Sequence, residues 1–225
     1  MNNNFVKYQD LMTIKEVDKR TCRQSFVSLD KEGTKVIGRY VTELNELEYS
    51  SDIKVRKNVL KRLSLADSFL KEINPNYQLM VVYGYRSMEK QVKYFNIELE
   101  KYKNDFKNKL DLYEFVHEKI AVPEVSGHPT GGAVDIVIND IRNNKIIDFG
   151  TKVHDYNKFK SYINYPNING VAFNNRMMLR KVMMKAGFAP YDGEWWHFSY
   201  GDKEWAYYYK KKKYLYPQVN KEDVY

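Results

Sequence analysis

Two short segments of the chain combine residue types that bind metal ions. His128 lies in a glycine-rich stretch that leads to Asp135 at the start of an apolar run, and His197 closes the sequence Glu-Trp-Trp-His at 194–197. A catalytic zinc ion takes three protein ligands of nitrogen or oxygen type and leaves a fourth position for water. Glycines let the backbone between His128 and Asp135 double back, so one segment can supply two ligands. His197 is the best candidate for the third.

Each segment on its own has an ordinary structural explanation. A histidine beside a glycine is usually a loop residue, and a single buried aspartate usually caps a helix or turn. Residues 194 and 197 also point to opposite sides of a regular strand, because side chains alternate along it. The segment must therefore bend where the strand begins if Glu194 and His197 are to serve one site.

The two motifs together resemble the D-alanyl-D-alanine dipeptidase family of zinc peptidases, peptidase family M15. The resemblance rests on S-x-H-x-x-G-x-A-x-D at 126–135 and E-W-W-H at 194–197. This family includes the vancomycin-resistance dipeptidases. Shorter similarities occur at 84–86, 148–151, 175–177, 186–188, 200–202 and 205–207. The resemblance covers roughly residues 78–207, whereas the first fifty residues are much less familiar.

The resemblance implies a role for each motif residue. His128, Asp135 and His197 correspond to the ligands of one zinc ion per chain. Glu194 corresponds to the catalytic base and Arg86 to the arginine that stabilises the transition state. Ser126 matches a residue that helps to hold the free amino end of the substrate, and the site walls are expected to include Trp195 and Trp196.

One position departs from the family pattern. Family dipeptidases have an aspartate that faces the substrate ammonium, and the corresponding position here holds His154, with Asp155 one residue later. A slip of one residue would restore the aspartate. Otherwise the pocket for the amino end differs, and free D-Ala-D-Ala need not be the preferred substrate.

The elements that must position these residues can be read from periodicity and breakers. Helices are expected over 54–73, from the N-cap Ser87 onwards, over much of 98–120 and over 174–186; strands are expected over 78–83, 133–138, 145–149 and 195–200. Residues 123–132 are expected to form a loop. The mixture predicts an α+β fold in one domain, with a central antiparallel sheet flanked by helices. By the resemblance, which extends to the hedgehog signalling domain, the zinc site lies at the sheet.

Within this single domain, three segments are expected. Residues 1–50 form an N-terminal segment that packs on the catalytic domain, residues 51–209 form the zinc peptidase core, and residues 210–225 form a basic, aromatic tail.

Composition narrows the classes of partner. The net charge is +8, but the basic residues are mostly dispersed, which is typical of a solvated surface. The exception is the lysine run at 210–213, which lies among tyrosines and could bind single-stranded nucleic acid. A solvated chain end is the simpler interpretation, so nucleic acid is not expected as a partner. The single cysteine, Cys22, excludes an internal disulfide and a cysteine-rich zinc site.

No apolar run reaches the length needed to cross a bilayer, and the first residues do not resemble a signal peptide. The sequence therefore predicts a cytoplasmic protein with no membrane partner, and the family resemblance implies that the cytoplasm is bacterial. The sequence carries no signal for an oligomeric state.

The predicted function is zinc-dependent hydrolysis of D-Ala-D-Ala or a similar small D,D-dipeptide. Two alternatives stay open. One is a zinc D,D-carboxypeptidase that acts on peptidoglycan stem peptides. The other is a zinc-containing binding module without catalysis, against which the presence of both Arg86 and Glu194 argues.

Overall fold

The computed structural model describes residues 5–16, 25–29, 36–39 and 52–224. The helices are α1 Tyr8–Met12, α2 Lys57–Ile73, α3 Met88–Tyr102, α4 Lys109–His117, α5 Gly170–Lys185 and α6 Lys203–Tyr208. The strands are β1 Lys15–Glu16, β2 Phe26–Ser28, β3 Ile37–Gly38, β4 Lys54–Arg56, β5 Tyr77–Tyr83, β6 Ala133–Asp140, β7 Lys145–Ile146, β8 Ala189–Tyr191, β9 Glu194–Ser199 and β10 Lys213–Tyr214. Cys22 lies outside the described residues.

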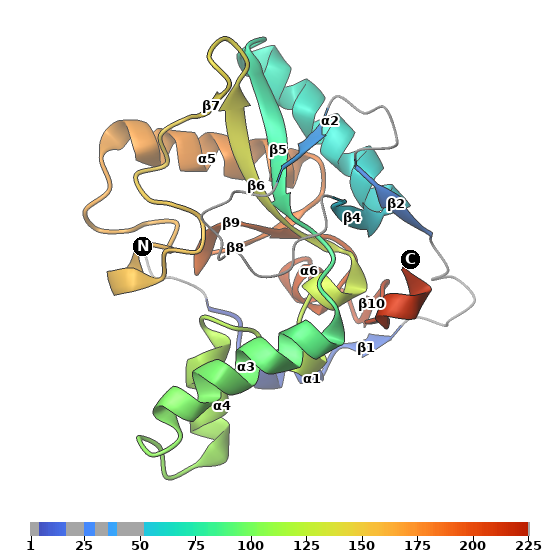
Figure 1. Ribbon diagram of the computed structural model, residues 1–225, viewed down its shortest axis with the longest axis vertical. Helices are drawn as coiled ribbons and strands as arrows, with labels where there is room; N and C mark the ends of the chain where they lie inside the picture. Colours follow the sequence, from blue (N-terminus) through green and yellow to red (C-terminus); the bar gives the residue numbers. More distant parts are fainter. Residues whose placement is uncertain (1–4, 17–24, 30–35, 40–51, 225) are drawn as a thin grey trace.

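A six-stranded sheet forms the centre of the fold (Figure 1). Its strand order is β3-β5-β6-β9-β8, with β7 paired to β6. All pairs are antiparallel except β3 with β5. The long strand β6 is buried along its whole length, as expected for a central strand covered on both faces.

One pair of helices packs on the sheet, and a second group of helices lies beyond the end of the sheet. Helices α2 and α5 share the main hydrophobic cluster with the strands, and the buried side chains of α2 recur at the helical period. Helices α3 and α4 form a second cluster with α1, built around buried Leu11, Phe95 and Val116. Figure 1 shows this second group below the sheet, at the end where β6 begins. The α+β class and the single domain are thereby confirmed, and the parallel edge strand β3 is an addition.

Several element boundaries differ from the prediction. Residues 54–56 are a strand paired with β2 rather than the first turn of α2, and the strand expected over 145–149 is limited to 145–146. Helix α5 begins at Gly170 because the side chain of Asn169 accepts the backbone N–H of Ala172 as an N-cap. Helical structure between 98 and 120 is interrupted between α3 and α4. Ser87 is an N-cap as predicted.

Residues 213–219 pack against distant parts of the chain. Strand β10 pairs in parallel with β1, and the ring of Tyr216 is buried. The side-chain amide of Gln218 donates to the carbonyl oxygens of Pro123 and Ser126 at 2.5 and 3.0 Å. These contacts tie the far end of the chain to the loop that precedes β6. Among the described residues, no helix is long and apolar enough to cross a membrane.

Candidate metal centre and active site

Strand pairing brings two of the expected ligands together. Asp135 on β6 lies directly opposite His197 on β9, and Tyr83 on β5 lies opposite Asp135 on the other side. Residues paired in this way project to the same face of a sheet. The side chains of Tyr83, Asp135 and His197 therefore form a row across three neighbouring strands.

His128 reaches this row from the loop before β6, where His128–Thr130 form one turn of 3-10 helix. Its Nδ1–H donates to the carbonyl oxygen of Gly84 at 2.8 Å, so Nε2 carries the lone pair that faces Asp135. A side chain at Gly84 could not be accommodated, because a Cβ there would lie 2.6 Å from the carbonyl oxygen of Lys54. Burial lowers the pKa of His128 to about 4, which keeps the imidazole neutral.

His197 faces Asp135 with Nδ1, whereas His128 faces it with Nε2. Nδ1 lies 3.1 Å from Oδ1 of Asp135, while Nε2 lies 3.2 Å from Oε2 of Glu204 on α6. Burial opposes the charged imidazole, but Asp135 and Glu204 together raise the pKa of His197 well above its ordinary value. The two carboxylates therefore favour the protonated form of the metal-free ring.

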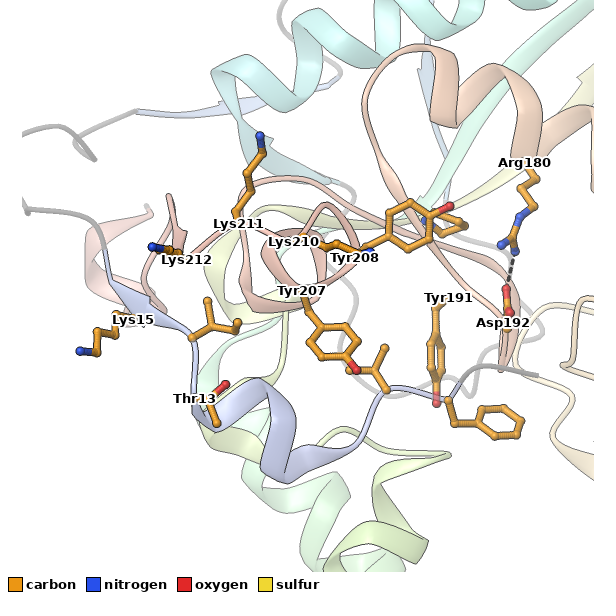
Figure 2. A pocket seen from close by; sticks show the side chains of 14 residues that line it. Thr13, Lys15, Arg180, Tyr191, Asp192, Tyr207, Tyr208, Lys210, Lys211 and Lys212 are labelled. Atoms are coloured by element: carbon orange, nitrogen blue, oxygen red, sulfur yellow. Dashed lines mark hydrogen bonds and ion pairs between the residues drawn. The ribbon is translucent and has the colours of Figure 1, made fainter. Parts of the chain in front are cut away.

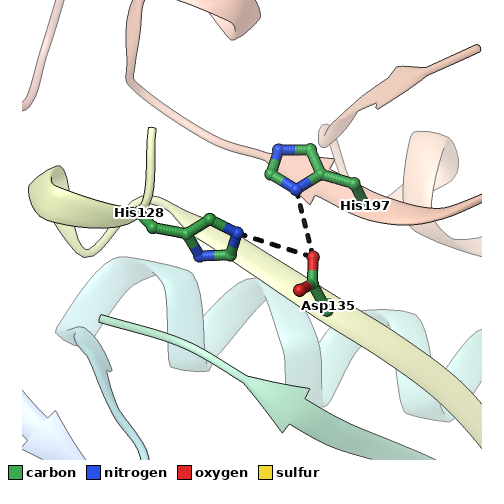
Figure 3. A group of neighbouring side chains, drawn as sticks. All are labelled: His128, Asp135 and His197. Atoms are coloured by element: carbon green, nitrogen blue, oxygen red, sulfur yellow. Dashed lines mark hydrogen bonds and ion pairs between the residues drawn. The ribbon is translucent and has the colours of Figure 1, made fainter. Parts of the chain in front are cut away.

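Figure 3 shows the three predicted ligands converging, with His128 and His197 both directed at Asp135. One donor atom from each residue lies within 4.8 Å of the others, and all three residues are buried. Burial opposes ionisation of Asp135, but its contacts with His128, His154 and His197 lower its pKa well below the ordinary value. Two imidazole nitrogens and one carboxylate match the donor set of a catalytic zinc site, and the outer nitrogen of each imidazole faces an oxygen.

The predicted base lies beside these atoms. Oε2 of Glu194 is 3.8 Å from Nδ1 of His197, and Oε1 accepts the hydroxyl of Tyr156 at 3.1 Å. This approach is possible because β9 is irregular: Pro190 pairs with Phe198, but the next residue of β8 pairs with Glu194. The expected bend is therefore present. Burial raises the pKa of Glu194 to about 7.

Arg86 follows β5 and is held by neutral partners. Its Nε donates to the hydroxyl of Tyr83 at 3.2 Å and an Nη donates to Oε1 of Gln91 at 2.9 Å. Its charge also lies over the rings of Tyr83 and Tyr94. Burial opposes the charge, but Tyr83 and Asp135 raise the pKa of Arg86 further, so the guanidinium stays protonated.

Both tryptophans are buried in the main hydrophobic core, and they differ in the rings that they contact. Trp196 makes edge contacts with the rings of His154 and Tyr156, at centroid distances of 5.4 and 5.7 Å. Trp195 stacks on Phe149 at 4.3 Å and donates its Nε1–H to Thr151, so its ring belongs to the hydrophobic core. Ser126 is buried at the end of the turn before His128, and its carbonyl oxygen accepts the amide of Gln218.

His154, rather than Asp155, faces the ligand cluster. Its Nε2 lies 2.9 Å from Oδ2 of Asp135, the carboxylate oxygen that His197 does not contact. Its backbone has φ of +61°, which is uncommon for a residue with a side chain. Asp155 is engaged elsewhere, because Oδ2 pairs with Lys160 at 3.0 Å and Oδ1 accepts the backbone N–H of Asn157. His154, and not Asp155, is therefore the side chain that contacts the carboxylate of Asp135.

Sequence reasoning missed several contributors to this site, among them Gly84, Tyr156 and Glu204. Gly84 acts through its backbone carbonyl, which no side-chain pattern reveals. Tyr156 follows the His-Asp pair in an irregular segment, and Glu204 lies one turn into a short helix after the last motif. Two signals in the sequence could have pointed to these residues. They are the glycine that precedes Tyr85 and Arg86, and the short separation of Glu204 from His197 along the chain.

A hollow with a volume of about 990 Å³ lies beside α6 and the N-terminal segment, away from the candidate metal centre (Figure 2). We call it the lysine groove, after Lys15, Lys210, Lys211 and Lys212 in its lining. The rings of Tyr191 and Tyr207 also line it, and Figure 2 shows the Lys15 and Lys212 side chains directed outwards. The groove contains none of the predicted catalytic or metal-binding residues.

A buried His-Asp-His set with a glutamate beside it is the site architecture of a mononuclear metallohydrolase. The chain belongs to peptidase family M15: the family model, described as D-ala-D-ala dipeptidase, matches residues 34–219. The resemblance found in the sequence is confirmed, and the chain is a peptidase by family.

Curated relatives agree. A D-alanyl-D-alanine dipeptidase of Synechocystis sp. is 27% identical over 220 residues, covering 85% of this chain and 87% of the relative. A D-alanyl-D-alanine dipeptidase of Escherichia coli is 33% identical over 74 residues, covering 33% of this chain and 37% of the relative.

Among solved structures, the LdcB LD-carboxypeptidase gives a TM-score of 0.48 at 19% identity, covering 91% of this chain and 87% of that chain. The vancomycin resistance D,D-pentapeptidase VanY, solved as a mutant in complex with Zn(II), gives 0.41 at 18% identity, covering 80% of this chain and 94% of that chain.

Proposed function

We propose that the protein hydrolyses D-Ala-D-Ala, or a similar small D,D-dipeptide, with one zinc ion per chain held by His128, Asp135 and His197. The observation that carries the proposal is the convergence of three buried donor atoms within 4.8 Å in a chain of this family. The approach of Glu194 to the same cluster supports catalysis rather than metal binding alone.

A zinc ion at this position supplies a coordinated water of lowered pKa and polarises the scissile carbonyl. Glu194 takes the proton of the attacking water and passes it to the leaving amine. Its pKa near 7 suits both halves of that transfer at neutral pH, and the hydroxyl of Tyr156 fixes the orientation of its carboxylate.

Arg86 stabilises the negative charge that develops on the carbonyl oxygen. A guanidinium keeps its charge at any working pH. Tyr83 and Gln91, which accept its hydrogen bonds, are neutral and therefore do not neutralise that charge. In the proposed site Ser126 and Trp196 contribute to the substrate pocket. A cytoplasmic location and the absence of nucleic-acid and membrane partners stay predictions of the sequence.

The test is release of free D-alanine from D-Ala-D-Ala by the zinc-loaded protein, with metal analysis of the same sample. L-Ala-L-Ala is the substrate control, and Glu194→Ala is the variant that should bind zinc without turnover. Selective release that disappears in the variant supports the proposal. A protein that retains one zinc but hydrolyses no D,D-substrate would instead support the non-catalytic binding module.

The surroundings of His154 favour a second candidate function, the D,D-carboxypeptidase. A substrate with a free ammonium group needs a carboxylate partner, and the described carboxylates beside the site already have roles or partners: Asp135 and Glu204 contact His197, and Asp155 pairs with Lys160. A stem peptide brings an acylated nitrogen, which carries no charge.

The two candidates are separated by comparing D-Ala-D-Ala with N-acetyl-D-Ala-D-Ala. Faster turnover of the acetylated substrate favours the carboxypeptidase, and His154→Asp should then move the preference towards the free dipeptide. Asp155→Asn is the matched control and should leave the preference unchanged. Faster turnover of the free dipeptide by the parent protein would favour the dipeptidase.

A further inference from the structure

The two histidines of the candidate metal centre use opposite ring nitrogens. His128 faces Asp135 with Nε2, and its Nδ1–H is fixed by the backbone carbonyl of Gly84. His197 faces Asp135 with Nδ1, so its outer nitrogen is Nε2. Each ring can bind a metal only in the tautomer whose proton is on the outer nitrogen.

We propose that Glu204 is the positioning residue that holds His197 in its metal-binding tautomer and orientation. Oε2 of Glu204 lies 3.2 Å from Nε2, and its side chain is largely buried, with 15% exposed. The two atoms lie within ion-pair distance, although they are not aligned as a regular hydrogen bond. A carboxylate at this place keeps the proton on Nε2 and makes Nδ1 a stronger donor.

Glu204 reaches His197 because the start of α6 lies close to the backbone of the His128 loop. Asp202 caps α6 by accepting the backbone N–H of Trp205 at 2.9 Å, which sets the first turn of the helix. The other carboxylate oxygen of Asp202 lies only 2.3 Å from the position that a Cβ on Gly127 would take. Gly127 therefore lets α6 lie against the His128 loop, and the first turn of α6 carries Glu204 to the outer edge of His197.

The other acidic side chains of this cluster cannot take over the role. Asp135 contacts the opposite nitrogen of His197, and Glu194 lies 3.8 Å from that same nitrogen. Asp202 is committed to the helix cap. Glu204 is the described carboxylate within ion-pair distance of Nε2.

This inference rests on the proposed zinc site but not on the substrate. It is tested by competition between the full-length protein and a chromophoric chelator for zinc. Glu204→Ala should weaken zinc binding about 10- to 100-fold. Glu204→Gln should lie between that variant and the parent, because its amide oxygen still accepts a hydrogen bond from Nε2–H but carries no charge. Glu100→Gln, at an exposed pair with Lys103, is the matched control and should bind like the parent.

Nitrogen-detected NMR of the histidine rings supplies a second readout. The zinc-loaded parent should show His197 protonated at Nε2, and this signature should be lost or exchange-broadened in Glu204→Ala. A merely structural contact would lower the melting temperature of the metal-free protein and leave the zinc affinity of the folded protein unchanged. Zinc affinity within twofold of the parent in both variants would overturn the proposal. If the alanine variant does not fold, the glutamine variant decides. A parent that binds no zinc would instead refute the proposed function.

Discussion

The ligand cluster and the lysine groove both gather titratable side chains, but they do so in different ways. In the cluster, Asp135 is almost fully buried, and its contacts with three histidines hold its pKa well below the ordinary value. In the groove, Lys210, Lys211 and Lys212 are exposed. Interactions between exposed charges are weakened by water and salt, whereas those between buried groups are weakened much less. In this protein, strong electrostatic coupling between side chains is therefore expected in the buried ligand cluster and not in the exposed lysine groove.

Removing the metal should have the largest effect on the ligand cluster. Treatment with a chelator should reduce D-alanine release to the background rate and lower the melting temperature, because a ligand that binds only the folded state stabilises it by about 4 kcal/mol at a thousandfold excess over Kd. Asp135→Ala should give the same loss, and Asp155→Asn should not. Full activity after verified removal of all metal would contradict the proposed chemistry.

The next largest effect is expected at the base. Glu194→Gln keeps an acceptor for Tyr156 but cannot take a proton, so turnover should fall by about 10²- to 10⁴-fold. Zinc binding should be unchanged, because Glu194 is not a proposed ligand. Steady-state kinetics and zinc titration of the same preparation measure both. Activity within a few-fold of the parent would remove Glu194 from the mechanism.

A smaller, graded effect is expected from pH. The raised pKa of His197 means that zinc must displace a proton, so apparent zinc affinity should fall about tenfold per pH unit below that pKa. The metal-free fold should show the opposite trend. Its stabilisation by His197 is complete below the ordinary pKa of 6.5 and is lost as pH rises through the raised value. Calorimetry in buffers of different ionisation enthalpy counts the protons released, and a count of zero would contradict the assignment.

The smallest effect is expected in the lysine groove. Replacing Lys211 and Lys212 by alanine should change the free energy of unfolding by no more than about 0.5 kcal/mol for each substitution, because exposed side chains contribute little. Zinc affinity and D-alanine release should stay at the parent level. A large loss of turnover in this variant would show that the two regions are coupled. The groove would then have a part in substrate binding.

The sequence predicted the local features of the site better than its surroundings. The metal motif, the N-cap at Ser87 and the end of α2 before Pro75 depend on neighbouring residues, and such signals survive in the sequence alone. The strand at 54–56 was missed because Val55 fits the helical period of α2, and only pairing with β2 makes it extended. Glu204 was missed for the same kind of reason, since its contact with His197 depends on how α6 returns against the His128 loop.

The bonds from Gln218 to the carbonyls of Pro123 and Ser126, and from the Val219 N–H to that of Pro129, have a consequence for biosynthesis. A ribosome delivers the His128 loop and Asp135 long before residues 197 and 217–219 emerge, and segments made first can begin to fold first. The hydrogen bonds that hold the loop in place can form only after residues 218 and 219 have been made. Capture of the metal in its final geometry is therefore expected only after residues 217–219 have been made, later than the pairing of β5 with β6.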